Sequence, residues 1–257
     1  MISLNKIANQ DVLAYLRQLP DESVQLIIAD PPYNLGPKFG NTEEWINSDT
    51  WLPWCIEWLS ECKRVLRPDG NLFVYGIHHY LCFIQVELYK LGLKYRRQII
   101  WNYENGFSTY KRSLATHYEP LLWFSKSEKY YFDEIREPYK SAERLKNPIK
   151  KNGKVWTPNP AGRIAGDVWY FPTLSGKRFA QEKVDHPTQK PLSISERLVE
   201  HFSAPGETVL IPFAGSGSEC VASIKLARNF LACELNGKYV QIANERISAL
   251  EANPITY

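Results

Sequence analysis

Residues 207–218, Glu207-Thr208-Val209-Leu210-Ile211-Pro212-Phe213-Ala214-Gly215-Ser216-Gly217-Ser218, decide the fold of this chain. The apolar run that ends at Pro212 predicts a short buried strand. Residues 219–226 predict a helix, and residues 228–233 predict a second strand that ends at Glu234. A strand, a Gly-x-Gly turn, a helix and a strand that ends in an acid are typical of a mononucleotide-binding β-α-β unit.

The two glycines of this turn indicate what it binds. Gly215 and Gly217 let the backbone approach a ligand at the amino end of the helix, and the carboxylate of Glu234 suits ribose hydroxyls. The third glycine of the dinucleotide fingerprint is absent, which argues against NAD or FAD. A lone Gly-x-Gly is equally typical of a structural turn, but the preceding strand and Glu234, seventeen residues after Gly217, favour nucleoside binding.

A second buried strand ends in an unusual turn. Residues 23–29 hold five apolar residues in seven and lead into Asp30-Pro31-Pro32-Tyr33. The prolines remove two backbone donors, so we expect the carbonyls of Asp30 and Pro31 to lack ladder partners. An acid, two carbonyls and a ring then lie where open α/β sheets bind ligands. The alternative is a stiff surface turn, which the acid and the tyrosine disfavour.

Strand and helix patterns alternate along most of the chain, which predicts an α/β fold with a doubly wound, mostly parallel sheet. Further helices are predicted over residues 12–19, 51–66, 80–91, 192–202 and 239–251, and further strands over 71–76, 97–103 and 119–125. Loops are predicted over 34–50, a segment placed to act as a lid, and over 104–117; Arg67-Pro68-Asp69-Gly70 predicts a turn. We expect one domain over residues 1–257.

Residues 127–185 break this alternation and predict an irregular insert within the domain. Ten Lys or Arg stand against three acids between Lys140 and Lys183, a local balance of +7 in a chain whose net charge is +3. The segment is also rich in aromatic residues. Basic groups contact phosphates and aromatic faces stack on bases, so the insert is expected to bind a polyanion such as DNA. A solvated lysine-rich loop with an aromatic mini-core is the alternative.

Composition narrows the class of protein. The 257 residues are 44% hydrophobic and 23% charged, without an apolar run long enough for a membrane span or a leader peptide, so a cytoplasmic location is expected. The five cysteines form no C-x-x-C pair and are expected to be buried thiols. The histidines lack metal-ligand spacing, so no metal site is expected. Because no apolar run is long enough, no membrane partner is expected either. Formation of a homodimer stays open.

The two turns together carry a resemblance. Asp30-Pro31-Pro32-Tyr33 followed by Pro212-Phe213-Ala214-Gly215-Ser216-Gly217 resembles the S-adenosylmethionine-dependent amino-methyltransferases of DNA. The catalytic motif precedes the cofactor motif, which is similar to the circularly permuted order of their β group. His186-Pro187-Thr188-Gln189-Lys190-Pro191 resembles a short element before the cofactor motif. Residues 159–163 and 167–169 look closest to adenine methyltransferases of type IIS restriction systems.

The resemblance implies a Rossmann-like methyltransferase fold, S-adenosylmethionine as cofactor and double-stranded DNA with one base flipped as substrate. By this resemblance Asp30 and the Pro31 carbonyl would hold the target's exocyclic amine, Pro32 would fix the turn, and Tyr33 would stack on the flipped base. The implied cofactor residues are Asp30, Thr188, Lys190, Phe213, Gly215, Ser216, Gly217 and Glu234, with Glu234 on the ribose and Thr188 and Lys190 near the methionine carboxylate.

Several activities fit this pattern. Adenine-N6 methylation in a restriction-modification system leads, because Asp at the head of the motif is usual in such enzymes. Cytosine-N4 methylation uses the same geometry but more often has Ser at that position. RNA or protein-glutamine methyltransferases often carry Asn there. A DNA-binding partner without catalysis is a further alternative, because the family usually has Asp where this chain has Ile211.

Overall fold

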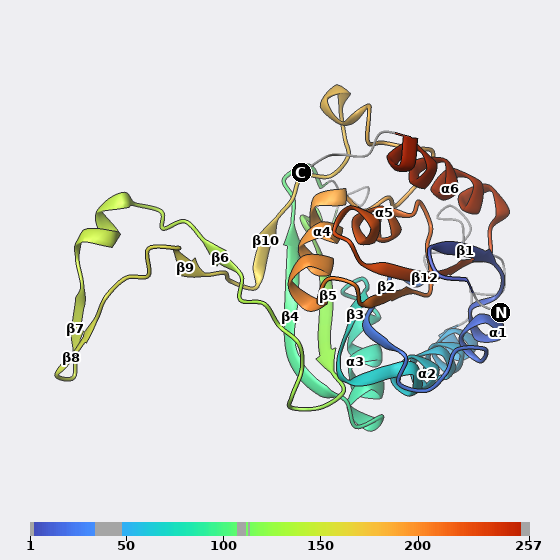
Figure 1. The fold of residues 1–257 in the computed structure, drawn as a ribbon, viewed down its shortest axis with the longest axis horizontal. Helices are drawn as coiled ribbons and strands as arrows, with labels where there is room; N and C mark the ends of the chain where they lie inside the picture. Colours follow the sequence, from blue (N-terminus) through green and yellow to red (C-terminus); the bar gives the residue numbers. More distant parts are fainter. Residues whose placement is uncertain (1–2, 34–47, 107–111, 113, 253–257) are drawn as a thin grey trace.

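The structure is a computed structural model that describes residues 3–33, 48–106, 112 and 114–252. Its centre is an eight-stranded sheet in the order β1-β12-β11-β2-β3-β5-β4-β10 (Figure 1). The strands of this sheet are β1 (Lys6–Asn9), β2 (Val24–Ala29), β3 (Leu66–Tyr75), β4 (Lys94–Asn102), β5 (Tyr118–Ser125), β10 (Val168–Tyr170), β11 (Thr208–Ile211) and β12 (Asn229–Glu234). The predicted mostly parallel α/β sheet is confirmed, because only β5 runs antiparallel to its neighbours.

Helices cover both faces of the sheet, as the doubly wound prediction requires. They are α1 (Val12–Leu16), α2 (Ser48–Val65), α3 (Leu81–Lys90), α4 (Leu192–Phe202), α5 (Ser218–Lys225) and α6 (Gly237–Ala252). The first three contribute to one buried apolar cluster and the last three to a second. Residues 26–29 of β2 alternate between these clusters, and all six residues of the strand are buried, which is why it reads as a nearly continuous apolar run.

The chain changes direction between β2 and β11. These strands are parallel neighbours, with Leu26 paired to Val209 and Ile27 to Leu210. From β2 the chain proceeds through α2 to β3 on one side, whereas from β11 it proceeds through α5 to β12 on the other. The turns that follow β2 and β11 therefore leave the sheet side by side at a topological switch point, where α/β proteins bind ligands.

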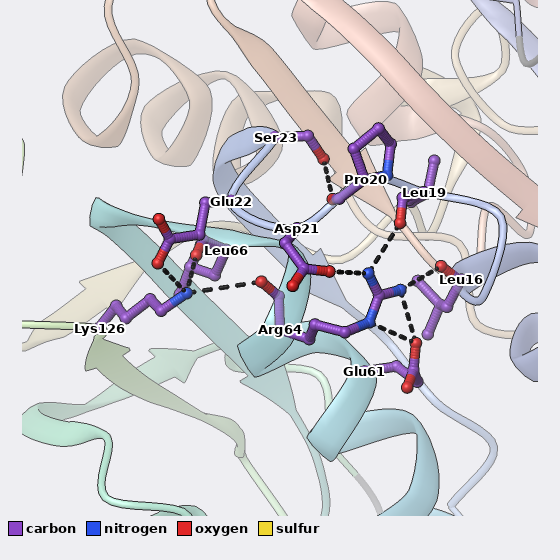
Figure 2. A network of polar contacts seen from close by, with 10 residues as sticks. All are labelled: Leu16, Leu19, Pro20, Asp21, Glu22, Ser23, Glu61, Arg64, Leu66 and Lys126. Carbon is purple, nitrogen blue, oxygen red and sulfur yellow. Dashed lines mark hydrogen bonds and ion pairs between the residues drawn. The ribbon is translucent and has the colours of Figure 1, made fainter.

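Arg64 fixes the segment that leads into β2. Its guanidinium donates to the backbone oxygens of Leu16 and Leu19 at 2.9 and 2.8 Å and pairs with Asp21 and Glu61 at 2.6 and 2.7 Å (Figure 2). The last turn of α2 is thereby joined to the end of α1. Hydrogen bonding to Glu61 raises the pKa of Arg64, which stays charged throughout the ordinary pH range.

Three local predictions differ from the structure. Residues 67–70 were predicted as a turn but belong to β3, where the pairing with β2 shifts register between Val24–Leu66 and Leu26–Asn71. The Pro-Asp-Gly signal marks this bulge. Cys82 is exposed, whereas the other four cysteines are buried. Helix α2 begins at Ser48, inside the predicted 34–50 loop; the lid predicted there falls on residues 34–47, outside the described part of the chain.

The predicted insert divides into two parts. Val168–Tyr170 forms β10, which pairs with β4 at the edge of the main sheet, and Trp169 is buried in the second cluster. The earlier part extends away from the body as a thin arm, shown in yellow-green in Figure 1. The arm, residues 136–164, contains the pairs β6 (Arg136–Glu137) with β9 (Arg163–Ile164) and β7 (Ile149–Lys151) with β8 (Lys154–Trp156). Only short 3-10 turns occur beside these strands, in agreement with the absence of a helix pattern.

None of the helices that the structure describes is long and apolar enough to cross a lipid bilayer.

Candidate functional site

The turns after β2 and β11 line one cavity of about 680 Å³. This volume lies within the range of roughly 300–1,000 Å³ that is usual for small-molecule sites. Ten of the eleven predicted site residues lie in its wall, which unites four separate segments of the sequence: Asp30, Pro31, Pro32, Tyr33, Thr188, Lys190, Phe213, Gly215, Ser216 and Glu234.

Gly217 is the predicted residue that does not line the cavity. It precedes α5 with a φ of 77°, and a Cβ at this position would lie 2.7 Å from the Cβ of Ala243. Its role is close packing of the turn against α6. Gly215 does lie in the wall, with a φ of 47°, and a Cβ there would come within 3.0 Å of His186 Nε2. A side chain at either glycine would therefore strain the turn.

Lys190 connects the predicted catalytic acid to a second carboxylate. Its Nζ lies 2.8 Å from Asp30 Oδ2 and 2.9 Å from Glu119 Oε1, and the side chain is 3% exposed. The resemblance placed Lys190 near the cofactor's carboxylate, whereas its ammonium contacts two carboxylates of the chain itself. Burial lowers the pKa of Lys190, but the charges of Asp30 and Glu119 outweigh burial and leave it raised.

The Tyr33 hydroxyl lies between the same two carboxylates. It is within hydrogen-bond distance of Asp30 Oδ1 and 2.6 Å from Glu119 Oε1, and Lys190 Nζ donates to it at 3.2 Å. Burial and then the negative charge of Asp30 raise the pKa of Tyr33, so its proton is retained. A phenol has one proton and donates to one carboxylate at a time. Burial also raises the pKa of Glu119, against the lowering effect of the Lys190 ammonium.

The two proline carbonyls have different surroundings. The Trp51 indole donates to the Pro32 carbonyl at 2.9 Å, which anchors the turn to α2. No hydrogen bond to the Pro31 carbonyl comes from the residues that the structure describes. Because Pro31 also lines the cavity, its carbonyl is available to a ligand donor. This matches the expectation that the double proline leaves a carbonyl without a ladder partner.

Glu234 forms the opposite end of the cavity. Its two carboxylate oxygens accept hydrogen bonds from the backbone of Gly215 at 2.9 Å and of Asn236 at 2.8 Å, so the side chain is held in place. Asp11 lines the same end and caps α1 through Ala14 N at 3.0 Å. β1 and β12 are parallel neighbours, with Asn9 opposite Glu234, which brings the residues after β1 to this end of the cavity.

Aromatic and imidazole side chains form much of the remaining wall. The ring of Phe213 packs against Trp54 and Trp58, with centroids 5.7 and 5.3 Å apart. His186 packs on Tyr239 with ring centroids 4.4 Å apart. Burial lowers the pKa of His186 to about 4, so this imidazole is neutral at physiological pH. A flat apolar ring fits against such a wall, and ribose hydroxyls fit at the acidic end.

Sequence reasoning missed several residues of this site. Glu119 is the second residue of β5, the antiparallel strand, which begins at the edge of the sheet where β3 and β4 end. No local sequence signal indicates that this strand is antiparallel. Glu219 follows the glycine turn on α5. The other unpredicted wall residues include Gln10, Asp11, Trp54, His186, Asn236 and Tyr239. Across the described residues, no group of three or more His, Cys, Asp or Glu is arranged to hold a metal ion.

Known proteins resemble this chain in sequence and in fold. A family model described as DNA methylase matches residues 24–245. "Type II methyltransferase M1.MboII" of Moraxella bovis is 36% identical, covering 98% of this chain and 100% of that protein. "DNA adenine methyltransferase YhdJ" of Escherichia coli (strain K12) is 33% identical, covering 94% and 82%.

A solved structure shares the fold at lower identity. The M1.HpyAVI-SAM complex superposes with a TM-score of 0.65 at 23% identity, covering 94% of this chain and 98% of that one. The match of the family model extends from β2 to the middle of α6 and includes both turns that line the cavity. The chain therefore belongs to the N6-adenine and N4-cytosine DNA methylase family.

Proposed function

We propose that this protein transfers a methyl group from S-adenosylmethionine to N6 of adenine in DNA. The observation that carries the proposal is the position of Asp30. Its carboxylate lies at the sheet's switch point, in the wall of a cavity of about 680 Å³, and is held by Lys190 Nζ at 2.8 Å. The names of the two relatives, a type II methyltransferase and a DNA adenine methyltransferase, support the same reaction.

The cavity fits S-adenosylmethionine. The ring of Phe213 and its tryptophan neighbours suit the adenine of the cofactor, and Glu234 suits the ribose hydroxyls. Thr188, Gly215 and Ser216 line the same cavity. Gly217 contributes by packing the turn, as described above. When bound, the cofactor supplies an electrophilic methyl group on a positively charged sulfur.

Asp30 and Pro31 orient the amine to be methylated. An exocyclic amine is a poor nucleophile because its lone pair is conjugated with the ring. Hydrogen bonds from its two protons to the Asp30 carboxylate and the Pro31 carbonyl would hold the nitrogen in a pyramidal geometry with its lone pair directed at the methyl group. The ion pair with Lys190 Nζ at 2.8 Å holds the Asp30 carboxylate in place as the acceptor.

The target base must leave the duplex to enter such a cavity. Unstacking costs a few kcal/mol, and stacking on the Tyr33 ring would offset part of this cost. The hydroxyl of Tyr33 is held by Asp30, Glu119 and Lys190, so the ring is oriented before the base arrives. Double-stranded DNA with one flipped base is the substrate that this geometry suits.

The arm is the element that we assign to target recognition. Its base is joined to the body, because Glu137 pairs with Arg163 on the neighbouring strand and with Arg197 of α4, each at 2.8 Å. Beyond that base the arm projects from the body (Figure 1) and carries Arg144, Lys146, Lys150, Lys151 and Lys154. A projecting basic element can reach phosphates that lie outside the catalytic cavity.

The tip of the arm presents a mixed face. Ile149 pairs with Trp156 and Lys151 with Lys154 across the β7–β8 hairpin, so these four side chains share one face. Trp156 is 62% exposed and Ile149 50% exposed. An isolated two-stranded hairpin with exposed apolar groups is marginally stable in water. A two-stranded ribbon fits the major groove of DNA, where lysines contact phosphates and apolar groups contact bases.

Cytosine-N4 methylation is the second activity that this geometry allows. The name of the Escherichia coli relative favours adenine, and so does Asp30 at the head of the turn. The type II relative supports a role in restriction-modification. The test is incubation of duplex DNA with the protein and methyl-labelled cofactor, followed by nucleoside analysis. Labelled N6-methyl-2′-deoxyadenosine is the expected product; labelled N4-methyl-2′-deoxycytidine, or DNA without label, would contradict the proposal.

A further inference from the structure

Glu219 is a buried carboxylate that the reaction described above does not use. It lies in the first turn of α5, is 5% exposed, and nevertheless forms part of the cavity wall. Its Oε1 accepts a hydrogen bond from the Ser195 hydroxyl at 3.0 Å. Within the described residues no Lys, Arg or His forms an ion pair with it. A buried carboxylate without a cation is unfavourable unless a ligand provides one.

The nearby cations are committed to other partners. Lys190 holds Asp30 and Glu119 at 2.8 and 2.9 Å. The Arg246 guanidinium donates to the backbone oxygen of Ser216 at 2.6 Å and to the Ser218 hydroxyl at 3.1 Å. Neither cation forms a salt bridge with Glu219. The carboxylate is therefore available to a positive group inside the cavity.

The charge of the cavity wall also indicates a cationic ligand. Among the described residues of the wall, the titratable side chains include the carboxyls of Asp11, Asp30, Glu219 and Glu234 but only one ammonium, that of Lys190. His186 does not compensate, because burial lowers its pKa to about 4. Ile211, at the end of the strand before the glycine turn, is 1% exposed and packs in the second apolar cluster. This strand end therefore contributes no carboxylate, and Glu219 is the acid nearest in sequence to the turn.

A buried hydroxyl that lacks a hydrogen-bond partner in the described part of the chain lies within the electrostatic reach of Glu219. The hydroxyl of Tyr75 is fully buried and has no hydrogen-bond partner among the described residues. Burial and then the negative charge of Glu219 raise its pKa, so the phenol lies within the electrostatic reach of that carboxylate. A buried water molecule beside Tyr75 would complete the hydrogen bonds of this hydroxyl.

We propose that Glu219 binds the α-ammonium group of the methionine half of S-adenosylmethionine. This inference rests on the proposed function, because it assumes that the cavity holds this cofactor. The adenosine half occupies the end formed by Phe213 and Glu234, which leaves the end near Asp30 and Glu219 for the sulfonium and the amino acid. Glu219 thus selects ligands that carry an ammonium group, while Ser195 orients its carboxylate.

The test is calorimetric binding of two ligands to the full chain. S-Adenosylhomocysteine carries the amino acid half, whereas 5′-methylthioadenosine carries only the adenosine half and lacks the ammonium. Glu219→Gln should weaken binding of S-adenosylhomocysteine by about 10- to 100-fold, as expected for loss of a hydrogen bond between two charged groups. Its affinity for 5′-methylthioadenosine should equal that of the wild type. Glu245→Gln, an exposed substitution on α6, should change neither affinity.

Other outcomes would overturn the inference. An equal loss of affinity for both ligands would assign Glu219 a structural role, and unchanged affinity for both would show that it does not bind the ammonium. If Glu219→Gln does not fold, Ser195→Ala should give a smaller loss of affinity that is again confined to S-adenosylhomocysteine. An equal loss of affinity for 5′-methylthioadenosine in that variant would contradict the proposal. Failure of the wild type to bind either ligand would instead refute the proposed function.

Discussion

The ammonium of Lys190 lies 2.8 Å from the Asp30 carboxylate, in a cavity where the lysine is almost fully buried. The contact joins the segment before α4 to the turn after β2, and Glu119 at the start of β5 completes it from the other side. A single buried cation thus fixes two carboxylates and, through them, the Tyr33 hydroxyl. This arrangement holds the acceptor groups in place before any substrate binds.

Lys190 and Glu119 should therefore be coupled in stability. Lys190→Met leaves two partly buried carboxylates without their buried cation and should lower the free energy of unfolding by about 3–5 kcal/mol. Adding Glu119→Gln removes one of those charges, so the double variant should be more stable than Lys190→Met alone. Urea unfolding of the wild type, both single variants and the double variant measures the coupling. If the decrease in the free energy of unfolding of the double variant equals the sum of the decreases of the two single variants, the two residues are not coupled.

The arm should contribute electrostatically to DNA binding. Lys151→Glu with Lys154→Glu reverses two charges on the hairpin face that carries Trp156. DNA affinity should fall, and the salt dependence of the affinity should become shallower by roughly one phosphate contact for each lysine. Binding titrations over a range of salt concentrations test this. Affinity for S-adenosylhomocysteine should remain unchanged; a DNA affinity equal to that of the wild type would exclude the hairpin from the interface.

Arg64 should stabilise the fold far from the cavity. Arg64→Met removes hydrogen bonds to two backbone oxygens and two carboxylates (Figure 2). We expect the free energy of unfolding to fall by about 2–3 kcal/mol. Arg17→Met is the matched control, because its contact with Glu57 joins two exposed side chains and should contribute less than about 1 kcal/mol. Thermal or urea unfolding measures both losses. An equal decrease in the free energy of unfolding for the two variants would contradict this prediction.

His186 should make stability sensitive to mild acid. Its pKa is lowered by burial to about 4 in the folded protein, compared with 6.5 for an unperturbed histidine. The unfolded chain therefore binds this proton first, and the stability that neutral His186 provides above pH 6.5 is lost progressively as the pH falls toward 4. Unfolding measured at pH 7 and pH 5 should show a smaller loss for His186→Gln than for the wild type or for His78→Gln, an exposed control. Equal losses in all three proteins would refute this.

Local sequence patterns were sufficient to predict most of the helices and strands. The apolar runs of β2 and β11 and the spacing of α2 and α4 follow directly from burial, so strands and helices were predicted close to their observed ends. The two motif turns were also recognised, because glycine and proline constrain the backbone locally. β10 was missed, since a three-residue edge strand within a proline-rich segment carries no clear period.

The residues missing from the predicted site depend on sheet order. Glu119 reaches Lys190 only because β5 is antiparallel and lies beside β3, and no local pattern indicates that pairing. Asp11 reaches the cavity because β1 pairs with β12 from the other end of the chain. Glu219 has an ordinary helical position, and its importance follows from burial beside a cavity. Such long-range neighbours require the three-dimensional structure.

The central claim is methylation of adenine N6 through Asp30. The most direct measurement is sequencing that maps modified bases in DNA from cells that express either the wild type or Asp30→Ala. The account predicts N6-methyladenine at one recurring short sequence with the wild type, and none with the variant, while purified Asp30→Ala still binds DNA. Methylation by Asp30→Ala at the wild-type level, or N4-methylcytosine in place of N6-methyladenine, would contradict it.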